Sequence, residues 1–184
     1  GGEPAIKDTE QALPVTHPRG LSYQSIESFG SKGVTTMIKN EKIITINRPI
    51  KEVFAYVSDL KTGSQWQSGL LEVRRVTEGP AGVGTQYTSA RKFLGKRVES
   101  GIEFTTYEPD KKLVFKSISG PSAFEESFLF ESTPEGTRIT TVLELQTGGL
   151  MGLADPLILS GLKRDMDTDF GTLKDVLESQ GTSI

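Results

Sequence analysis

Six strand-like segments follow one another between residues 70 and 147, and each ends in a turn that contains glycine or proline. Their predicted bounds are 70–77, 85–93, 98–107, 112–119, 124–132 and 137–147. The connections are too short for the crossover of roughly a dozen residues that a parallel pair of strands requires. We therefore predict an antiparallel meander rather than alternating strands and helices.

The chain before this meander predicts one more strand and two short helices. Residues 38–46 read as a strand, which Pro49 ends because proline lacks a backbone N–H donor. Val53, Phe54 and Val57 then have the spacing of a short amphipathic helix, which we expect to end near residue 59. A second short helix or turn over residues 62–67 carries the single tryptophan, Trp66.

The chain after the meander predicts a long helix with one apolar face. Large apolar side chains recur there at steps of three to five residues; they are Leu150, Leu153, Leu157, Leu162, Met166, Phe170, Leu173 and Leu177. Pro156 should kink this helix or mark its start, with Asp155 as a candidate cap.

Residues 1–36 differ from the rest of the chain. Pro4, Pro14 and Pro18, together with scattered glycine and serine, interrupt any regular pattern. We predict a loosely ordered extension, or a segment foreign to the natural protein because Met37 directly precedes the first strand, and one domain over residues 37–184. No apolar core follows a basic start, so a signal peptide is not expected.

Composition excludes several kinds of chemistry. The 184 residues contain no cysteine and one histidine, His17, which lies in the extension. Thiolate metal sites, cysteine nucleophiles and multi-histidine metal sites are therefore excluded. The net charge of −3 offers no general attraction to nucleic acid. We expect a cytoplasmic monomer without metal or cofactor, with no nucleic-acid partner and no integral membrane association.

Two motifs that superficially suggest sites do not qualify. Asp165, Asp167 and Asp169 have the spacing of a calcium loop, but Phe170 stands where glycine is required and Val176 where glutamate is required. On a helix these three aspartates should be solvated charges. Gly82 and Gly84 lack the third glycine and the surrounding unit of a dinucleotide site, so we interpret them as a hairpin turn.

The order of elements, together with several segments, resembles a known superfamily. The segments are ITINRPIKEVFAYVSDL (44–60), TEGPAGVGTQY (77–87), YEPDKKLVFKSISGP (107–121), PEGTRITTVLEL (134–145) and residues 148–179. Together they resemble a bacterial SRPBCC (START/Bet v 1-like) protein of the polyketide cyclase/dehydrase-like kind. The resemblance implies an α+β helix-grip fold, in which a curved seven-stranded antiparallel sheet wraps around a long C-terminal helix, and two short helices follow the first strand.

In such a fold a cavity lies between sheet and helix, and one parity of each strand faces it. The positions of the large apolar residues select that parity. The inner residues that we expect to bind a ligand are Tyr87, Ser89, Arg91, Ile102, Phe104, Phe115, Glu126, Phe128, Thr141 and Leu143 on the strands, Leu159, Leu162 and Met166 on the helix, and Trp66 near the entrance. The same parity includes Phe93, Val98, Ser100, Leu113, Ser117, Phe124, Phe130, Ile139 and Leu145.

The polar members of this face carry the most information. The aromatic residues can simply fill the core, and Trp66 can be a packing anchor. A buried charge is costly unless it is paired or hydrated, so Arg91 and Glu126 should lie at the mouth, in a wet cavity, or bonded to each other or to a ligand.

Three functions are compatible with this pattern. The favoured one is binding or transport of a small, largely apolar molecule such as a lipid, isoprenoid or polyketide-like compound. The second is a metal-free cyclase or dehydratase in which Glu126, Tyr87 and Arg91 perform acid–base work, Arg91 polarising a carbonyl or stabilising an enolate. The third is a protein–protein adaptor or co-chaperone, which predicts a packed interior.

Overall fold

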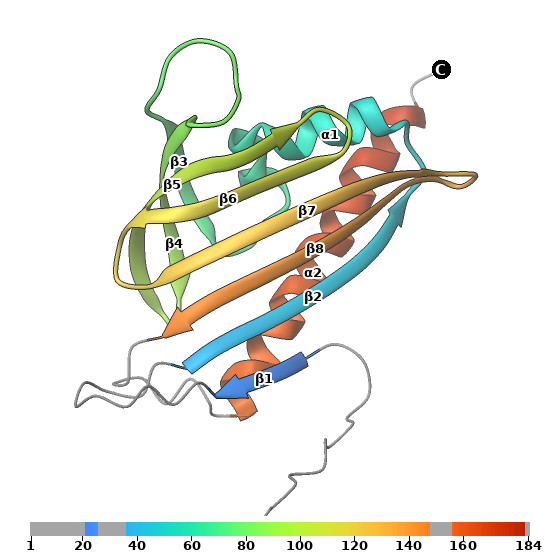
Figure 1. The fold of residues 1–184 in the computed structure, drawn as a ribbon. Helices are drawn as coiled ribbons and strands as arrows, with labels where there is room; N and C mark the ends of the chain where they lie inside the picture. Colours follow the sequence, from blue (N-terminus) through green and yellow to red (C-terminus); the bar gives the residue numbers. More distant parts are fainter. Residues whose placement is uncertain (1–20, 26–35, 148–155, 183–184) are drawn as a thin grey trace, which may run out of the picture.

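The computed structural model describes residues 21–25, 36–147 and 156–182. Figure 1 shows its elements, which follow one another as β1 (Leu21–Ser25), β2 (Thr36–Ile46), α1 (Ile50–Ser58), the 3-10 helix η1 (Leu60–Gln65), β3 (Leu70–Arg75), β4 (Gln86–Phe93), β5 (Lys96–Glu108), β6 (Lys112–Ser119), β7 (Ala123–Thr133), β8 (Gly136–Thr147), α2 (Pro156–Ser179) and the 3-10 helix η2 (Gln180–Thr182). Most of the predicted extension lies outside the described residues, as do His17, Leu150, Leu153 and the candidate cap Asp155.

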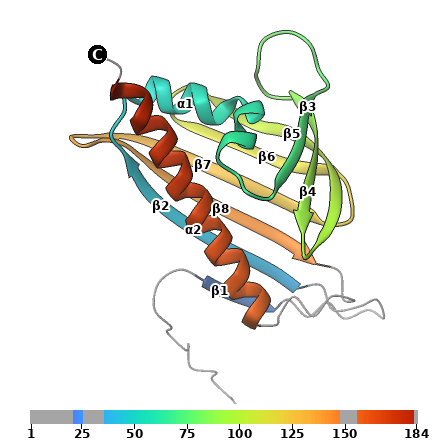
Figure 2. The same ribbon diagram turned by 180° about the vertical axis from the view of Figure 1, so that it is seen from behind.

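The strands form one antiparallel sheet in the order β1-β2-β8-β7-β6-β5-β4-β3. Consecutive strands from β3 to β8 are neighbours, which is the predicted meander, and β2 pairs with the last strand, β8. Helix α2 runs across one face of this sheet, and α1 lies near its C-terminal end (Figure 2). The predicted helix-grip fold is therefore confirmed, with its long C-terminal helix and its short helices after the first predicted strand.

One strand within the predicted extension was not anticipated. Residues 21–25 form β1, which pairs antiparallel with β2 and makes the sheet eight-stranded. The physical reason is the free edge of β2, whose backbone donors and acceptors on the side away from β8 can pair with any extended segment. Five residues are too few for alternation to be recognised in the sequence.

Proline sets the start of both α-helices. Pro49 precedes α1 with φ −60° and ψ 143°, and the helix begins at Ile50. It ends at Ser58, and Asp59 then caps η1 by accepting a hydrogen bond from the Lys61 backbone N–H at 3.2 Å. Pro156 is the first residue of α2, so of the two predicted roles it takes the one at the helix start.

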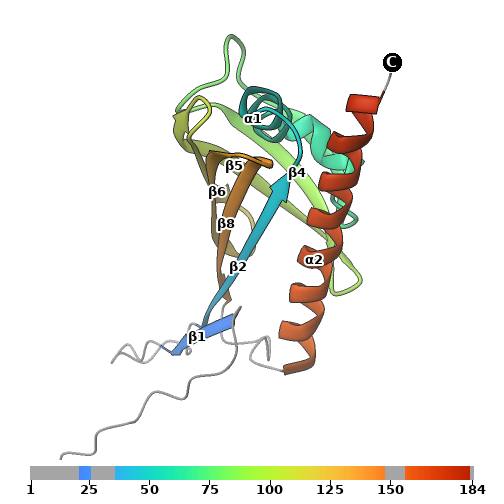
Figure 3. The same cartoon turned by 90° about the vertical axis from the view of Figure 1, so that its right-hand side faces the viewer.

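Aromatic rings form the centre of the core between sheet and helices. Phe54 of α1 meets Tyr107 and Phe130 edge-on at centroid distances of 5.4 and 5.1 Å. Trp66 meets Phe170 of α2 edge-on at 5.3 Å. These residues belong to one core cluster with the sheet, so α1, the residue after η1 and α2 all pack on it. Figure 3 shows the sheet and α2 from the side.

A bulge in β5 changes which residues face the core. The register with β6 shifts between Phe104 and Thr106, so that Tyr107 lies on the same face as Phe104 and stacks on it at 5.8 Å. Strict alternation would turn Tyr107 outward, but the extra residue of a bulge reverses the parity beyond it.

Candidate functional site

The inner face of the sheet has a packed half near α1 and the C-terminal end of α2. On the strands its buried members are Tyr87, Ser89, Ile102, Phe104, Leu113, Phe115, Phe128, Phe130, Ile139 and Thr141. Phe170, Leu173 and Leu177 of α2 are buried against them. Phe104, Leu113, Ile139 and Thr141 are completely buried, so the protein's own side chains fill the centre of this half.

The other half of the inner face is only partly covered. Its members, which we call the open half, are Phe93, Val98, Ser100, Ser117, Phe124, Leu143 and Leu145 on the strands and Leu159, Leu162 and Met166 on α2. Helix α2 runs in the same direction as β2, because Asp167 is bonded to Lys42 at 2.7 Å and Lys174 to the Thr45 carbonyl at 2.6 Å. The first turns of α2 therefore lie level with the open half.

Glu126 lies at the boundary between the two halves. Along β7 it stands between Phe124 of the open half and Phe128 of the packed half. Its cross-strand neighbours are Phe115 on β6 and Leu143 on β8. The hydroxyl of the buried Thr141 donates a long hydrogen bond of 3.4 Å to its carboxyl. A carboxyl group is thus held in a largely apolar region of the inner face.

This environment changes the acidity of Glu126. Burial raises the pKa of its carboxyl to about 7, because the charged form loses hydration. The positive charge of Arg91 and the hydrogen bond from Thr141 lower this pKa, and the negative charge of Asp169 raises it. The group is therefore poised to gain or lose a proton near neutral pH.

Arg91 is exposed and reaches back toward the interior from β4. Its Nη1 donates a hydrogen bond of 2.6 Å to the side-chain oxygen of Gln67, in the segment that follows η1. The structure thus brings Arg91 and Glu126 within electrostatic range of each other without a direct ion pair between them. Both stay predictions as ligand contacts.

Asp169 corrects the sequence analysis, which expected a solvated charge. It is buried, and its Oδ1 accepts hydrogen bonds from the backbone N–H and the hydroxyl of Ser68 at 2.9 and 2.8 Å. The prediction was wrong because Asp169 lies beside the apolar stripe of α2 and meets a loop that helical periodicity cannot reveal. This contact fastens the segment after η1 to α2.

Trp66 is buried on this same segment, edge-on to Phe170. Its ring belongs to the core, as the packing interpretation requires. Its indole N–H, however, has no hydrogen-bond partner among the described residues. A buried donor without an acceptor is uncommon in native proteins.

Tyr87, the third candidate acid–base residue, lies near the start of β4. It is buried against Phe104, and it stands four residues from Arg91 along β4, a distance of roughly 13 Å in an extended strand. Burial raises its pKa, and the charge of Arg75 lowers it. The structure therefore brings Arg91 and Glu126 within electrostatic range of each other, and Tyr87 stays a prediction as an acid–base residue.

Asn40, Gln67 and Ser68 were absent from the sequence-based candidates. Asn40 is buried on β2 and lies two strands from Glu126, in the same cross-strand row through Leu143. Alternation with Ile38 could have identified it. Gln67 and Ser68 lie in a loop without periodicity, so no sequence pattern indicates their contacts.

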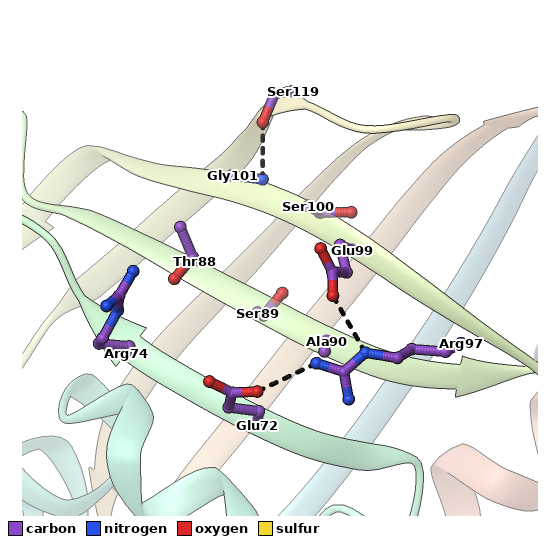
Figure 4. A pocket seen from close by; sticks show the side chains of 10 residues that line it. All are labelled: Glu72, Arg74, Thr88, Ser89, Ala90, Arg97, Glu99, Ser100, Gly101 and Ser119. Carbon is purple, nitrogen blue, oxygen red and sulfur yellow. Dashed lines mark hydrogen bonds and ion pairs between the residues drawn. The ribbon is translucent and has the colours of Figure 1, made fainter.

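Two surface depressions border the described strands. One of about 310 Å³ is lined mostly by polar residues of β3, β4, β5 and the end of β6, and it includes Ser89 and Ser100 of the inner-face parity. Figure 4 shows that Arg97 bridges Glu72 and Glu99 there, each at 3.0 Å. The other, of about 500 Å³, is lined by Thr45, Asn47, Glu135 and Lys174.

Within residues 21–25, 36–147 and 156–182, no group of three or more histidine, cysteine or acidic side chains could hold a metal ion. Neither helix in these ranges has the length and apolar character that crossing a membrane requires.

Comparison with known proteins places the chain in a family. Residues 37–178 match the family model described as polyketide cyclase / dehydrase and lipid transport. A search of curated proteins found no match.

Solved structures agree in fold. The chain is similar to TTHA0849 from Thermus thermophilus, at 20% identity and TM-score 0.62, over 79% of this chain and 99% of that one. It is similar to Ara h 8.0201 at 16% identity and TM-score 0.59, over 78% and 99% of the two chains. It also resembles BexL, a di-domain ARO/CYC of the BE-7585A biosynthetic pathway, at 16% identity and TM-score 0.62, over 77% of this chain and 50% of that one. The chain belongs to the polyketide cyclase/dehydrase and lipid transport family.

Proposed function

We propose that the protein binds a small, largely apolar molecule between the open half of the inner face and the first turns of α2. The observation that carries the proposal is the partial exposure of apolar side chains on both surfaces, such as Phe124 and Leu143 on the sheet and Leu162 on α2. Covering apolar surface yields roughly 25 cal/mol per Å², so a ligand that removed about 200 Å² from water would gain about 5 kcal/mol.

The polar groups at the inner end of the open half give the ligand an orientation. Arg91 supplies a cation, and Glu126 supplies a carboxyl that can donate or accept a hydrogen bond. An apolar surface with a few convergent polar groups is typical of sites for small molecules. We infer a ligand with an apolar body and at least one oxygen acceptor, which is compatible with a lipid, an isoprenoid or a polyketide-like compound.

An enzyme of the cyclase or dehydratase kind is the second candidate. It is favoured by the pKa of about 7 at Glu126, since a general base works best with a pKa near ambient pH. Arg91 would stabilise an enolate oxygen while Glu126 takes the proton from carbon. A ligand that is recovered unchanged after long incubation with the wild-type protein would exclude this candidate for that ligand.

Replacing Leu162 by Gln tests the binding proposal. The fluorescent probe N-phenyl-1-naphthylamine should bind the wild-type protein, and L162Q should raise its dissociation constant by about tenfold, because an amide on the apolar surface loses hydrogen bonds to water when the probe covers it. The measurement is a fluorescence titration.

Leu129→Gln is the matched control, because Leu129 is an exposed leucine of β7 at 45% exposure. The proposal expects L129Q to bind the probe as the wild type does. Equal weakening by both variants would move binding to the outer face of the sheet. A protein that binds no apolar probe would favour the adaptor interpretation instead.

A further inference from the structure

Arg75 is the last residue of β3 and faces the interior. It is directly opposite Tyr87 in the β3–β4 register, and cross-strand partners lie on the same face of a sheet. Tyr87 is buried in the core, and Val73, two residues before Arg75, packs against the same core. Arg75 therefore carries its charge onto the inner face, on β3, four strands along the sheet from Glu126 on β7.

The guanidinium of Arg75 has one unoccupied edge. Its Nε and Nη2 atoms are both buried, and neither has a hydrogen-bond partner among the described residues. These two nitrogens form one side of the planar group, and their N–H bonds point in parallel. That side matches the two oxygens of a carboxylate. Burying these donors without an acceptor is unfavourable, so a ligand that supplied an acceptor there would bind favourably.

The surroundings supply further donors but no acceptor that occupies this edge. The phenol groups of Tyr87 and Tyr107 act on each other electrostatically, and within the described residues neither hydroxyl forms a hydrogen bond. Asp59 acts on Tyr87 too, but its Oδ1 accepts the Lys61 N–H as the cap of η1. Within the described ranges Arg75 forms no ion pair with Asp59 or with another acid.

We propose that Arg75 anchors a second ligand site, which takes the carboxylate of a small molecule on the Nε–Nη2 edge, with the hydroxyls of Tyr87 and Tyr107 as additional donors. The site differs from the open half in its charge and its position. Arg91 is exposed and already bonded to Gln67, whereas the Nε–Nη2 edge of Arg75 is buried and has no hydrogen-bond partner among the described residues. The inference does not depend on the proposed binding of an apolar molecule.

Nuclear magnetic resonance of the arginine Nε–H groups tests this site in the wild-type protein. Titration with benzoate should move the Arg75 Nε–H resonance along a saturating curve, whereas benzyl alcohol, which has no charge, should leave it in place. Arg75→Lys keeps the charge but removes the fork, so benzoate binding at this end, followed by the neighbouring amide resonances, should weaken about tenfold or more. Thermal unfolding would verify that the variant is folded.

Four outcomes would overturn the inference, and the first three concern Arg75 alone. The Arg75 resonance could fail to respond, it could respond equally to chloride at matched ionic strength, or it could respond only in Asp59→Asn, which would mean that Asp59 occupies the fork in solution. A benzoate response at Arg91 without one at Arg75 would also reject this site. That last result would leave the proposed function intact, so the two proposals fail separately.

Discussion

Replacing Glu126 by Gln should stabilise the free protein at pH 8. The carboxyl of Glu126 has a pKa of about 7 in the folded protein against 4.5 as its ordinary value. Because the folded pKa is the higher one, folding favours the protonated form. The free energy of unfolding therefore falls as the pH rises from about 4.5 to about 7, and it stays low above that. Glutamine keeps the shape of the protonated acid and cannot ionise.

The gain in the free energy of unfolding from E126Q should be at most about 3 kcal/mol at pH 8. It should vanish near pH 4, where Glu126 is protonated in both the folded and the unfolded protein. Urea denaturation at several pH values measures it. Arg91, Asp169 and Thr141 face the same carboxyl and are unchanged in the variant. Glu125→Gln is the matched control, because Glu125 is the exposed neighbour on β7 and should change stability by less than about 0.5 kcal/mol.

An E126Q protein that is less stable than the wild type at pH 8 would contradict this account, and so would a stability difference that does not depend on pH. Either result would mean that the Glu126 carboxylate is well solvated or paired in solution. A confirmed gain would indicate that the protein keeps a destabilising acid on its inner face, as functional sites often do.

Phe104→Ala should cost about 3–5 kcal/mol of unfolding free energy, the usual range for deleting a buried phenylalanine ring. Phe104 is completely buried, and its ring meets those of Tyr87, Tyr107 and Phe115. Phe124→Ala removes the same atoms from the open half, where the ring is only partly covered, and should cost about 1 kcal/mol. Chemical denaturation of both variants gives the comparison.

In ligand binding the order should be reversed, with the larger effect in F124A. F124A should weaken binding of N-phenyl-1-naphthylamine several-fold, because Phe124 contributes surface to the proposed site, whereas F104A, where folded, should change it less. Equal costs in stability for the two substitutions would remove the distinction between a packed and an open half. The proposed ligand position would then lose its basis.

The sequence predicts the architecture well because its signals are local. Proline fixes the starts of α1 and α2, turns separate the strands, and a stripe of large apolar residues identifies α2. What it misses depends on contacts between distant segments. The role of Asp169 needs Ser68 from another element, the inward turn of Tyr107 needs a bulge, and the position of Arg75 needs the β3–β4 register.

The candidate site divides in the same way. Strand parity placed Glu126 on the inner face, but it could not tell that this residue lies at the boundary between packed and open halves, because coverage depends on the path of α2. Parity also grouped Tyr87 with Arg91. The two residues share a face of β4, but four residues of extended strand separate their backbones.

Nuclear magnetic resonance of methyl groups can locate the bound molecule. With N-phenyl-1-naphthylamine bound, intermolecular nuclear Overhauser effects should connect the probe to Leu143, Leu145, Leu162 and Met166 of the open half. The methyl groups of Leu113, Ile139 and Leu173, which are completely buried in the packed half, should show none. Contacts to Ile43 or Leu129, two exposed residues of β2 and β7, without contacts to the open half would contradict the account.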